Sequence, residues 1–304
     1  MKVSIVMATY GHERFIAQAI DGVLMQDTSF SFELIIANDH SPDGTDQLVQ
    51  NYINNHPKGN LIRYFHNQKN MGMLSNFLFA LDKTKGRYIA ICEGDDYWTD
   101  PLKLQKQVDF LDLHENINVC FHQIDYVDIN SKNIGSPEYQ FDCSVSQYLS
   151  YENLIESWNI NTCSIVFRKT FERVPSFINT FKVGDQPLFY FMNMNKCSYY
   201  IHDVMASYRI TDLGSTGTFV KNELKSDLEF PFLDKINELS NNKYSNVIKR
   251  RKSRTVIKDL KFMKTNGKYK FITRAEFYFK HLFYLLNYQR GIKVTFYCFF
   301  KYVI

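Results

Sequence analysis

Short apolar runs alternate with amphipathic segments through the first 125 residues of the chain. The apolar runs, which are typical of buried strands, span residues 3–8, 32–37, 61–65 and 87–92. Apolar residues recur at helical spacing between and after them, at residues 13–25, 43–54, 74–81 and 102–113. Strands that alternate with helices at this interval predict an α/β fold, with a Rossmann-like, mostly parallel sheet flanked by helices.

The alternation ends near residue 220. The later segments predict helices only, at residues 223–239, 247–263, 271–288 and 292–304. We therefore expect an α/β domain of residues 1–219 and a helical C-terminal region of residues 220–304. No uncharged apolar run reaches the ~18 residues of a membrane-spanning helix, and the N-terminus turns polar too soon for a signal peptide. The six scattered cysteines lack zinc-ligand spacing, so a cytoplasmic chain with free thiols is expected.

Charge is distributed unevenly along the chain. The net charge is +4, yet residues 249–304 carry 15 Lys and Arg against Asp259 and Glu276, a balance of +13 that leaves −9 for the rest. Basic residues interleaved with Phe, Tyr and Leu are typical of helices in an anionic membrane interface. Packing on the α/β domain or on a second subunit of a homo-oligomer is an equal alternative. Nucleic acid is less favoured, because these aromatics are mixed with Leu and Ile in long apolar stretches.

A polar cluster follows each expected strand, at the end where parallel sheets bind ligands. The densest cluster holds Glu93, Asp95 and Asp96, directly after residues 87–92. Carboxylates this close raise one another's pKa, and a divalent cation such as Mn²⁺ or Mg²⁺ would neutralise them. An acidic turn that caps the helix starting near Pro101 is an equal alternative. The sequence has no GxGxxG after the first strand and no Walker A loop, so a bound diphosphate would need a metal.

The other polar clusters occupy residues 9–13, 38–45 and 67–72. Tyr10 is either a half-buried aromatic residue at a turn or a platform on which a base stacks. Asp39, considered alone, is more typical of an Asx-turn or a helix cap. Asp43 and Thr45 are expected to cap the second helix.

Three segments of the first domain carry a family resemblance. They read Val-Ser-Ile-Val-Met-Ala-Thr-Tyr at residues 3–10, Glu-Leu-Ile-Ile-Ala-Asn-Asp-His-Ser-Pro-Asp-Gly-Thr at 33–45, and Gly-Arg-Tyr-Ile-Ala-Ile-Cys-Glu-Gly-Asp-Asp at 86–96. In this order they resemble the family 2 glycosyltransferases, which are inverting enzymes of the GT-A fold that use nucleotide-diphosphate sugars. The resemblance covers roughly residues 1–215.

The resemblance implies roles for individual residues. Asp95 and Asp96 would occupy the metal and ribose-phosphate positions of the family's Asp-x-Asp motif, with Mn²⁺ or Mg²⁺ as the metal. The first acid of that motif is commonly Asp, and this chain departs from the pattern with Glu93. The donor, a UDP-sugar in the first instance, would be bound by Thr9, Tyr10, Glu13, Asp39, Asn70, Glu93, Asp95 and Arg209.

The later part of the domain is expected to supply the acceptor side. Residues 182–189, Lys-Val-Gly-Asp-Gln-Pro-Leu-Phe, resemble the place where the family puts its catalytic carboxylate, which implies that Asp185 is the general base. Such a base takes the proton of the attacking hydroxyl, although a helix N-cap is the alternative role. Residues 202–210 resemble the strand that precedes the family's active-site lid, and Arg209 in it is expected either to reach the diphosphate or to form a structural ion pair. Residues 213–217 have the Gly and Ser content of a mobile loop, which the resemblance identifies with that lid.

Two tryptophans and one histidine have either a packing role or a role at the site. Trp98 and Trp158 are expected to pack in or near the sheet edge, and Trp98 is also a weaker candidate for stacking on an acceptor sugar. His202 is expected to be a packed strand residue, with a role at the site as the less favoured alternative.

The predicted function is a metal-dependent inverting glycosyltransferase that extends a glycan or lipid-linked acceptor in surface polysaccharide synthesis, peripheral on the inner face of the cell membrane. A sugar-phosphate nucleotidyltransferase is an alternative, although that class needs a Gly-rich, basic loop where residues 9–13 stand. A non-catalytic glycan-binding relative is another, with Glu93 as a sign of decay. The retained Asp95, Asp96 and Asp185 argue against it.

Overall fold

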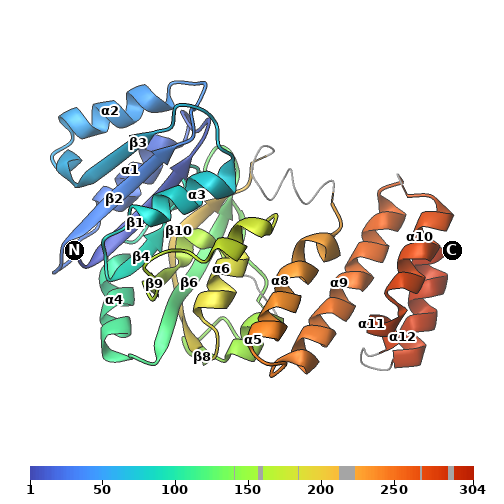
Figure 1. The fold of residues 1–304 in the computed structure, drawn as a ribbon. Helices are drawn as coiled ribbons and strands as arrows, with labels where there is room; N and C mark the ends of the chain where they lie inside the picture. Colours follow the sequence, from blue (N-terminus) through green and yellow to red (C-terminus); the bar gives the residue numbers. More distant parts are fainter. Residues whose placement is uncertain (140, 157–159, 184, 212–222, 268, 287–290) are drawn as a thin grey trace. The chain divides into compact units, whose positions relative to one another are not determined.

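The computed structural model describes residues 1–304 except 140, 157–159, 184, 212–222, 268 and 287–290, which are drawn in grey in Figure 1. The domain boundary expected at 219/220, the lid expected at 213–217 and Trp158 all lie outside the described residues. Within the part of the chain that is described, no helix is both long and apolar enough to cross a bilayer.

A ten-stranded sheet runs through the first of two compact units, which comprises Met1–Tyr151 and Asn159–Thr211. Its strands are β1 (Val3–Thr9), β2 (Phe32–Asn38), β3 (Ile62–His66), β4 (Tyr88–Ile91), β5 (Tyr97–Trp98), β6 (Ile117–Val127), β7 (Asn133–Gly135), β8 (Gln147–Leu149), β9 (Val166–Arg168) and β10 (Cys197–Arg209). The main order is β3-β2-β1-β4-β9-β6-β10-β5. The first four strands pair in parallel, as predicted, whereas β9 is antiparallel to both of its neighbours.

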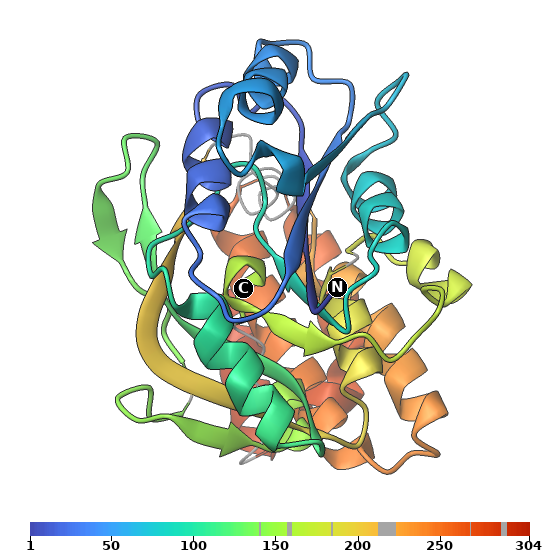
Figure 2. The ribbon, with the colours of Figure 1, turned by 90° about the vertical axis from the view of Figure 1, so that its left-hand side faces the viewer.

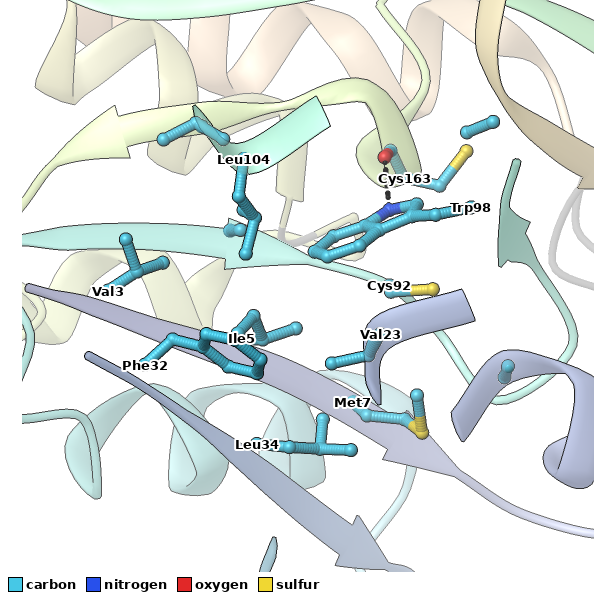
Figure 3. Packing of buried hydrophobic residues seen from close by; sticks show 14 of the residues in the cluster. Val3, Ile5, Met7, Val23, Phe32, Leu34, Cys92, Trp98, Leu104 and Cys163 are labelled. Atoms are coloured by element: carbon cyan, nitrogen blue, oxygen red, sulfur yellow. Dashed lines mark hydrogen bonds between the residues drawn. The ribbon is translucent and has the colours of Figure 1, made fainter. Parts of the chain in front are cut away.

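Helices bury the parallel strands from both faces. They are α1 (Ile16–Leu24), α2 (Thr45–Asn55), α3 (Met73–Asp82) and α4 (Lys103–Leu113). All seven residues of β2 and six of seven in β1 are buried, which is why these strands read as continuous apolar runs. Val3, Ile5 and Met7 of β1 pack on one face with Val23 of α1 (Figure 3). Helix α3 lies on the other side of these strands (Figure 2). This arrangement confirms the expected α/β class.

The first helix begins later than its sequence pattern predicts. It was expected from residue 13 and begins at Ile16. The backbone N–H groups of Phe15 and Ile16 both donate to the carbonyl oxygen of His12 at 2.8 Å, so residues 12–15 form a turn that delays the helix. That turn keeps the residues after β1 at the sheet edge.

The second unit comprises Glu152–Trp158 and Asp212–Ile304 and is helical. Its principal elements are α8 (Lys225–Leu239), α9 (Ser245–Thr265), α10 (Phe271–Lys280), α11 (Leu282–Leu286), α12 (Gly291–Cys298) and the π-turn η4 (Phe299–Val303). The single helix expected at 271–288 is wrong, because the chain breaks between α10 and α11 at His281. An apolar cluster joins these helices through Val256, Leu260, Met263, Phe277, Tyr278, Leu285, Cys298 and Val303.

A buried ion pair links α8 to α9. Arg251 donates from Nε and Nη2 to the two carboxylate oxygens of Glu229, at 3.1 and 2.9 Å. Burial alone would raise the pKa of Glu229, but the Arg251 charge and hydrogen bonds outweigh it and lower that pKa to about 2. This carboxylate is therefore compensated within the protein itself.

Candidate active site at the carboxyl edge of the sheet

The carboxyl ends of β2, β1 and β4 lie side by side (Figure 1). Thr9 and Asn38 are register partners at the ends of β1 and β2, and the N–H of Asp39 donates to the Thr9 carbonyl oxygen at 2.9 Å. On the other side, the N–H of Gly94 donates to the Ala8 carbonyl oxygen at 3.1 Å. One edge of the sheet therefore carries three of the polar clusters, at residues 10–13, 39–45 and 93–96.

Reciprocal hydrogen bonds join the first two of these loops. The N–H groups of Gly11 and Glu13 donate to the side chains of Ser41 and Asp43, each at 3.0 Å. In return, the Glu13 carboxylate accepts the N–H of Gly44 at 3.0 Å. Glu13 thus fixes the shape of the loop pair, and its direct contact with a nucleoside stays a prediction.

The buried carboxylate of Asp39 orders the loop after β3. It accepts the backbone N–H groups of Met71 and Gly72 at 2.8 and 2.9 Å and the Asn67 amide at 3.0 Å. These donors lie about thirty positions away in sequence, so Asp39 is not the local Asx-turn or cap that it resembles in isolation. Asn70 is exposed on this loop and its Oδ1 accepts the Gly72 N–H at 2.9 Å.

Exposed apolar side chains stand on the two loops beside Asp39. Tyr10 is 47% exposed, and Met71 and Met73 are 38% and 51% exposed. Flat or flexible apolar groups at the edge of a polar site suit stacking on a planar ring. The structure is therefore compatible with Tyr10 as a base platform.

The acidic loop after β4 is held at both ends. Glu93 accepts a hydrogen bond from the Thr162 hydroxyl at 2.8 Å. Asp96 is 2% exposed and accepts the backbone N–H of Arg209 at 2.8 Å. Asp95, between them, is only partly buried. Of the three carboxyls, Asp96 is thus the one most committed to the protein interior.

Close contact with Thr9 and His12 explains the glycine inside the acidic loop. A Cβ on Gly94 would lie 2.6 Å from Oγ1 of Thr9 and 2.8 Å from Nδ1 of His12. His12 itself spans the gap, with Nδ1 3.2 Å from Thr9 Oγ1 and Nε2 3.9 Å from a carboxylate oxygen of Asp95. Any side chain at position 94 would therefore push the acidic loop away from the first strand.

Arg209 supports the acidic loop from the interior. It is 3% exposed, and its Nε donates to the backbone carbonyl oxygen of Asp95 at 2.9 Å. Its two terminal nitrogens donate to Asp128 O, Ser131 Oγ and Gln18 Oε1. The observed partners are carbonyl and hydroxyl oxygens, not a carboxylate. The structure therefore supports a positioning role, and contact with a diphosphate stays a prediction.

Asp185 comes to the acidic loop from a distant part of the chain. It is the first residue of α6 (Asp185–Met192), and its negative charge contributes to a raised pKa at Glu93. Burial raises the pKa of Asp185 itself, while the backbone N–H of Gln186 opposes that rise. The helix-start position predicted for Asp185 is confirmed, and both of its candidate roles, base and N-cap, fit this position.

Residues 4–190 match the model of the family described as Glycosyl transferase family 2. The chain belongs to this family. It is 38% identical over 177 residues to an uncharacterized protein of Mycobacterium tuberculosis, covering 57% of this chain and 49% of that protein. It is 34% identical over 118 residues to the putative glycosyltransferase EpsE of Bacillus subtilis, covering 39% and 41%. The chain thus spans about half the length of the curated relatives it matches.

Solved structures confirm the GT-A fold of this family 2 chain. TarS 1–349 of S. aureus, in complex with UDP-GlcNAc, superposes with a TM-score of 0.68 at 17% identity, covering all of this chain and 88% of that one. The mannosyltransferase PcManGT of Pyrobaculum calidifontis, in complex with GDP-Man and Mn²⁺, gives a TM-score of 0.59 at 13% identity, covering 98% and 84%.

Glu93 and Asp96 in the acidic loop of this family 2 chain have higher pKa values than isolated carboxyl groups. Burial, the charge of Asp95 and the charge of Asp185 together raise the pKa of Glu93 to about 8, against the hydrogen bond from Thr162. Burial, Asp95 and Glu93 likewise raise the pKa of Asp96 well above its usual range. Among the described residues, no Lys or Arg side chain pairs with these carboxyls.

The donor set fits a cation that is shared with a ligand. Among the residues that can be described, no three His, Cys, Asp or Glu side chains are arranged to hold a metal by themselves. Mg²⁺-type sites are commonly made by one or two carboxylates plus substrate phosphates. Clustered carboxyls with raised pKa values are consistent with such a partial site. Asp95 is the better placed of the two predicted ligands, and Asp96 as a ligand stays a prediction.

Trp98 lies inside the protein. Figure 3 shows its indole near Cys92, and Nε1 donates to the Cys163 carbonyl oxygen at 2.9 Å. The side chain is 2% exposed and β5 ends the sheet order, so packing at the sheet edge is confirmed. Stacking of Trp98 on an acceptor sugar is wrong. His202 is also not the packed residue expected, since its side chain is 53% exposed.

Proposed function

We propose that the chain is an inverting glycosyltransferase that moves a sugar from a nucleotide-diphosphate sugar to a hydroxyl of a glycan or lipid-linked acceptor, in surface polysaccharide synthesis. The observation that carries this proposal is the single sheet edge where Tyr10 and Asp39 adjoin an uncompensated acidic loop, whose Glu93 has its pKa raised in part by the charge of Asp185. Membership of the family supports it, as do neighbours of the same fold in complex with UDP-GlcNAc or GDP-Man.

The nucleoside end of the donor would lie over the loops joined by Glu13 and Asp39. Tyr10 offers an exposed ring for the base, and the rigid loops hold it in place before the donor arrives. A UDP-sugar is the proposed donor. Because these loops are already ordered before the donor binds, less conformational entropy is lost on binding.

The diphosphate end would lie at the acidic loop. A divalent cation, Mn²⁺ or Mg²⁺, bound at Asp95 with Asp96 as the second proposed ligand would stabilise the charge that develops on the departing diphosphate. Arg209 and Thr162 keep the loop in shape, the first through the Asp95 backbone and the second through the Glu93 carboxyl.

Asp185 would accept the proton of the acceptor hydroxyl as that hydroxyl attacks the anomeric carbon from the face opposite the diphosphate. The resulting inversion needs only one such base. Its pKa is raised by burial, which makes its carboxylate a better proton acceptor than an exposed one. Because Asp185 is partly buried, fewer water molecules compete with the acceptor hydroxyl for its carboxylate.

Two other functions use parts of the same site. A sugar-phosphate nucleotidyltransferase would need phosphate-binding glycines and a basic loop after β1, whereas residues 9–13 contain one glycine and no Lys or Arg. A non-catalytic glycan-binding relative would not need Asp185 beside the acidic loop. Peripheral attachment to an anionic membrane on its cytoplasmic side belongs to the proposal, homo-oligomers are compatible with it, and nucleic acid is not a proposed partner.

The decisive experiment is hydrolysis and transfer with a panel of nucleotide sugars, with Mn²⁺, Mg²⁺ or a chelator. We expect nucleoside diphosphate release with one donor, dependent on the metal. Asp185→Asn should lower kcat by ~10²–10⁴-fold and change nucleotide affinity far less, because it removes the base and only the smallest of the causes that raise the pKa of Glu93. The matched control is Asp142→Asn on an exposed loop, which should be neutral. Absence of both turnover and nucleotide binding under every metal would refute the proposal.

A further inference from the structure

Exposed apolar side chains are concentrated at the end of the helical unit. Among the described residues, 23 large apolar side chains are exposed, and nine of them lie within residues 271–304. That segment is about a ninth of the chain, so the enrichment is severalfold. The nine form what we call the C-terminal aromatic surface: Phe271, Ile272, Phe279, Phe283, Leu286, Phe296, Tyr297, Phe300 and Ile304.

These residues are not simply the surplus of an unfinished core. The same helices bury Phe277, Tyr278, Leu285, Cys298 and Val303 in a cluster of their own. The helices therefore have a filled inner face and an apolar outer face. An outer face of this kind in a monomer marks a contact with something else.

Part of the surface follows one side of a helix. Lys293 precedes Phe296 and Tyr297 by three and four residues, and Phe300 follows them by four and three, so these exposed residues of α12 and the start of η4 lie on one stripe. Two ring contacts connect this stripe to α10. The ring centroid of Phe299 lies 6.2 Å from that of Phe279 in α10 and 5.8 Å from that of Phe300 in the stripe.

Basic residues surround the aromatic ones. Residues 261–304 contain nine Lys and Arg and one acid, Glu276. Lys301 stands over the rings of Tyr297 and Tyr302, 4.8 and 5.6 Å from their centroids. Where the structure describes this segment, the exposed lysines are Lys261, Lys264, Lys270, Lys280, Lys293 and Lys301.

We propose that the C-terminal aromatic surface docks in the interface of an anionic bilayer. Phe, Tyr and Leu would enter the headgroup and acyl boundary while the lysines stay among the headgroups, the arrangement of interfacial helices. Charge decides against a second copy of the chain, because a self-complementary contact would bring two strongly basic faces together. The lipid surface offers the opposite charge and an apolar layer at once.

This inference adds to the proposed function a means of reaching a lipid-linked acceptor. Its test is binding to vesicles and needs no catalysis. A chain that binds vesicles but shows neither turnover nor nucleotide binding with any metal would leave the docking surface standing and refute the proposed function. A chain that turns over a nucleotide sugar but does not bind vesicles would do the opposite.

The experiment is co-flotation of the full chain with vesicles of phosphatidylcholine, with and without phosphatidylserine. We expect binding that requires phosphatidylserine and weakens with salt. Phe296→Ser with Phe300→Ser should lower partitioning by roughly a hundredfold, at about tenfold for each buried ring. Lys293→Gln with Lys301→Gln should lower it by roughly thirtyfold.

Matched controls use exposed residues of the first unit. Leu113→Ser with Tyr148→Ser removes two exposed apolar side chains, and Lys132→Gln with Lys196→Gln removes two exposed charges. Both pairs should float as the wild type does. Circular dichroism and thermal melting show that each variant is folded.

Three outcomes would overturn the proposal. The first is equal flotation of the Phe296/Phe300 double variant and the wild type. The second is no vesicle binding by a wild-type dimer that the same double substitution converts to a monomer in analytical ultracentrifugation, which would assign the surface to a second copy. The third is salt-sensitive binding to single-stranded nucleic acid without any binding to vesicles.

Discussion

Glu229, which is buried, and Glu93, which is half-buried, have opposite electrostatic surroundings. Glu229, in the helical unit, meets the Arg251 guanidinium at 2.9 and 3.1 Å, and its pKa falls to about 2. Glu93, in the α/β unit, meets a hydroxyl and two further negative charges, and its pKa rises to about 8. Arg251 compensates the charge of Glu229, whereas no Lys or Arg side chain among the described residues pairs with Glu93.

The difference separates structural charges from functional ones. A buried carboxylate with its own cation stabilises the fold and needs nothing more, whereas a cluster that raises its own pKa values costs stability unless a ligand completes it. Burial raises the pKa of both glutamates, so the opposite net shifts come from their charged partners. Substitutions around either glutamate test this contrast.

The largest expected effect follows from removing the compensating charge. Arg251→Leu leaves buried Glu229 with only the exposed Lys225 ammonium, 3.5 Å away, and should lower the free energy of unfolding by about 3 kcal/mol. The control is Arg87→Leu, which removes an exposed pair with Asp112 and should cost under about 1 kcal/mol. Urea unfolding measures both. Similar losses in the two variants would contradict the distinction between the buried and the exposed pair.

The contributions of the two glutamates to the pH dependence of stability should have opposite signs. The pKa of Glu93 is raised from 4.5 to about 8, so its stabilising proton is fully held below pH 4.5 and is lost as the pH rises through about 8. The pKa of Glu229 is lowered from 4.5 to about 2, so its contribution is present above pH 4.5 and is lost as the pH falls through about 2.

Cysteine labelling can follow the two units separately, since Cys92 is buried in the first and Cys298 in the second. Without metal, raising the pH from 4.5 to 8 should lower the denaturant midpoint at Cys92 in the wild type relative to that in Glu93→Gln, a comparison in which the opposing titration of buried His122 cancels. The midpoint at Cys298 should be the same in the two proteins at each pH. A wild-type midpoint at Cys92 that rises relative to the variant over this range would show the sign to be wrong.

The smallest effect concerns the hydroxyl that holds Glu93. Thr162→Val keeps the side-chain shape and removes the 2.8 Å hydrogen bond, worth about 1–2 kcal/mol. Metal-dependent nucleotide affinity should fall by roughly tenfold or less, which calorimetry can resolve. Thr180→Val, at an exposed position, is the matched control. Unchanged affinity in Thr162→Val would mean that Glu93 needs no support.

The first half of the fold could be predicted because buried parallel strands must be apolar on both faces. The long strands β6 and β10 were harder, and only residues 202–210 of β10 were expected. β6 carries Asn118 and His122 among its buried residues, and such polar groups hide the pattern. Asn118 is tolerated because its amide donates to the Met192 carbonyl oxygen, a partner that exists only in the folded chain.

The same limit applies at the site. Asp39 and the acidic loop could be located by their place after strands. Their partners could not, since Asp39 binds backbone N–H groups of Met71 and Gly72, which leave no signature in side-chain sequence. Thr162 begins the short 3₁₀ helix η2 (Thr162–Ser164), 69 residues after Glu93, and no motif marks it. Contacts of this kind depend on tertiary structure.

The central claim is that the acidic loop binds a divalent cation together with the nucleotide. Calorimetry of UDP and Mn²⁺ binding to the full chain at neutral pH, in buffers of different ionisation enthalpy, counts the protons exchanged. Because the pKa of Glu93 is about 8 without metal, binding should release protons, and Glu93→Gln should release fewer. Binding of UDP that is unaffected by Mn²⁺ and releases no protons would contradict the account.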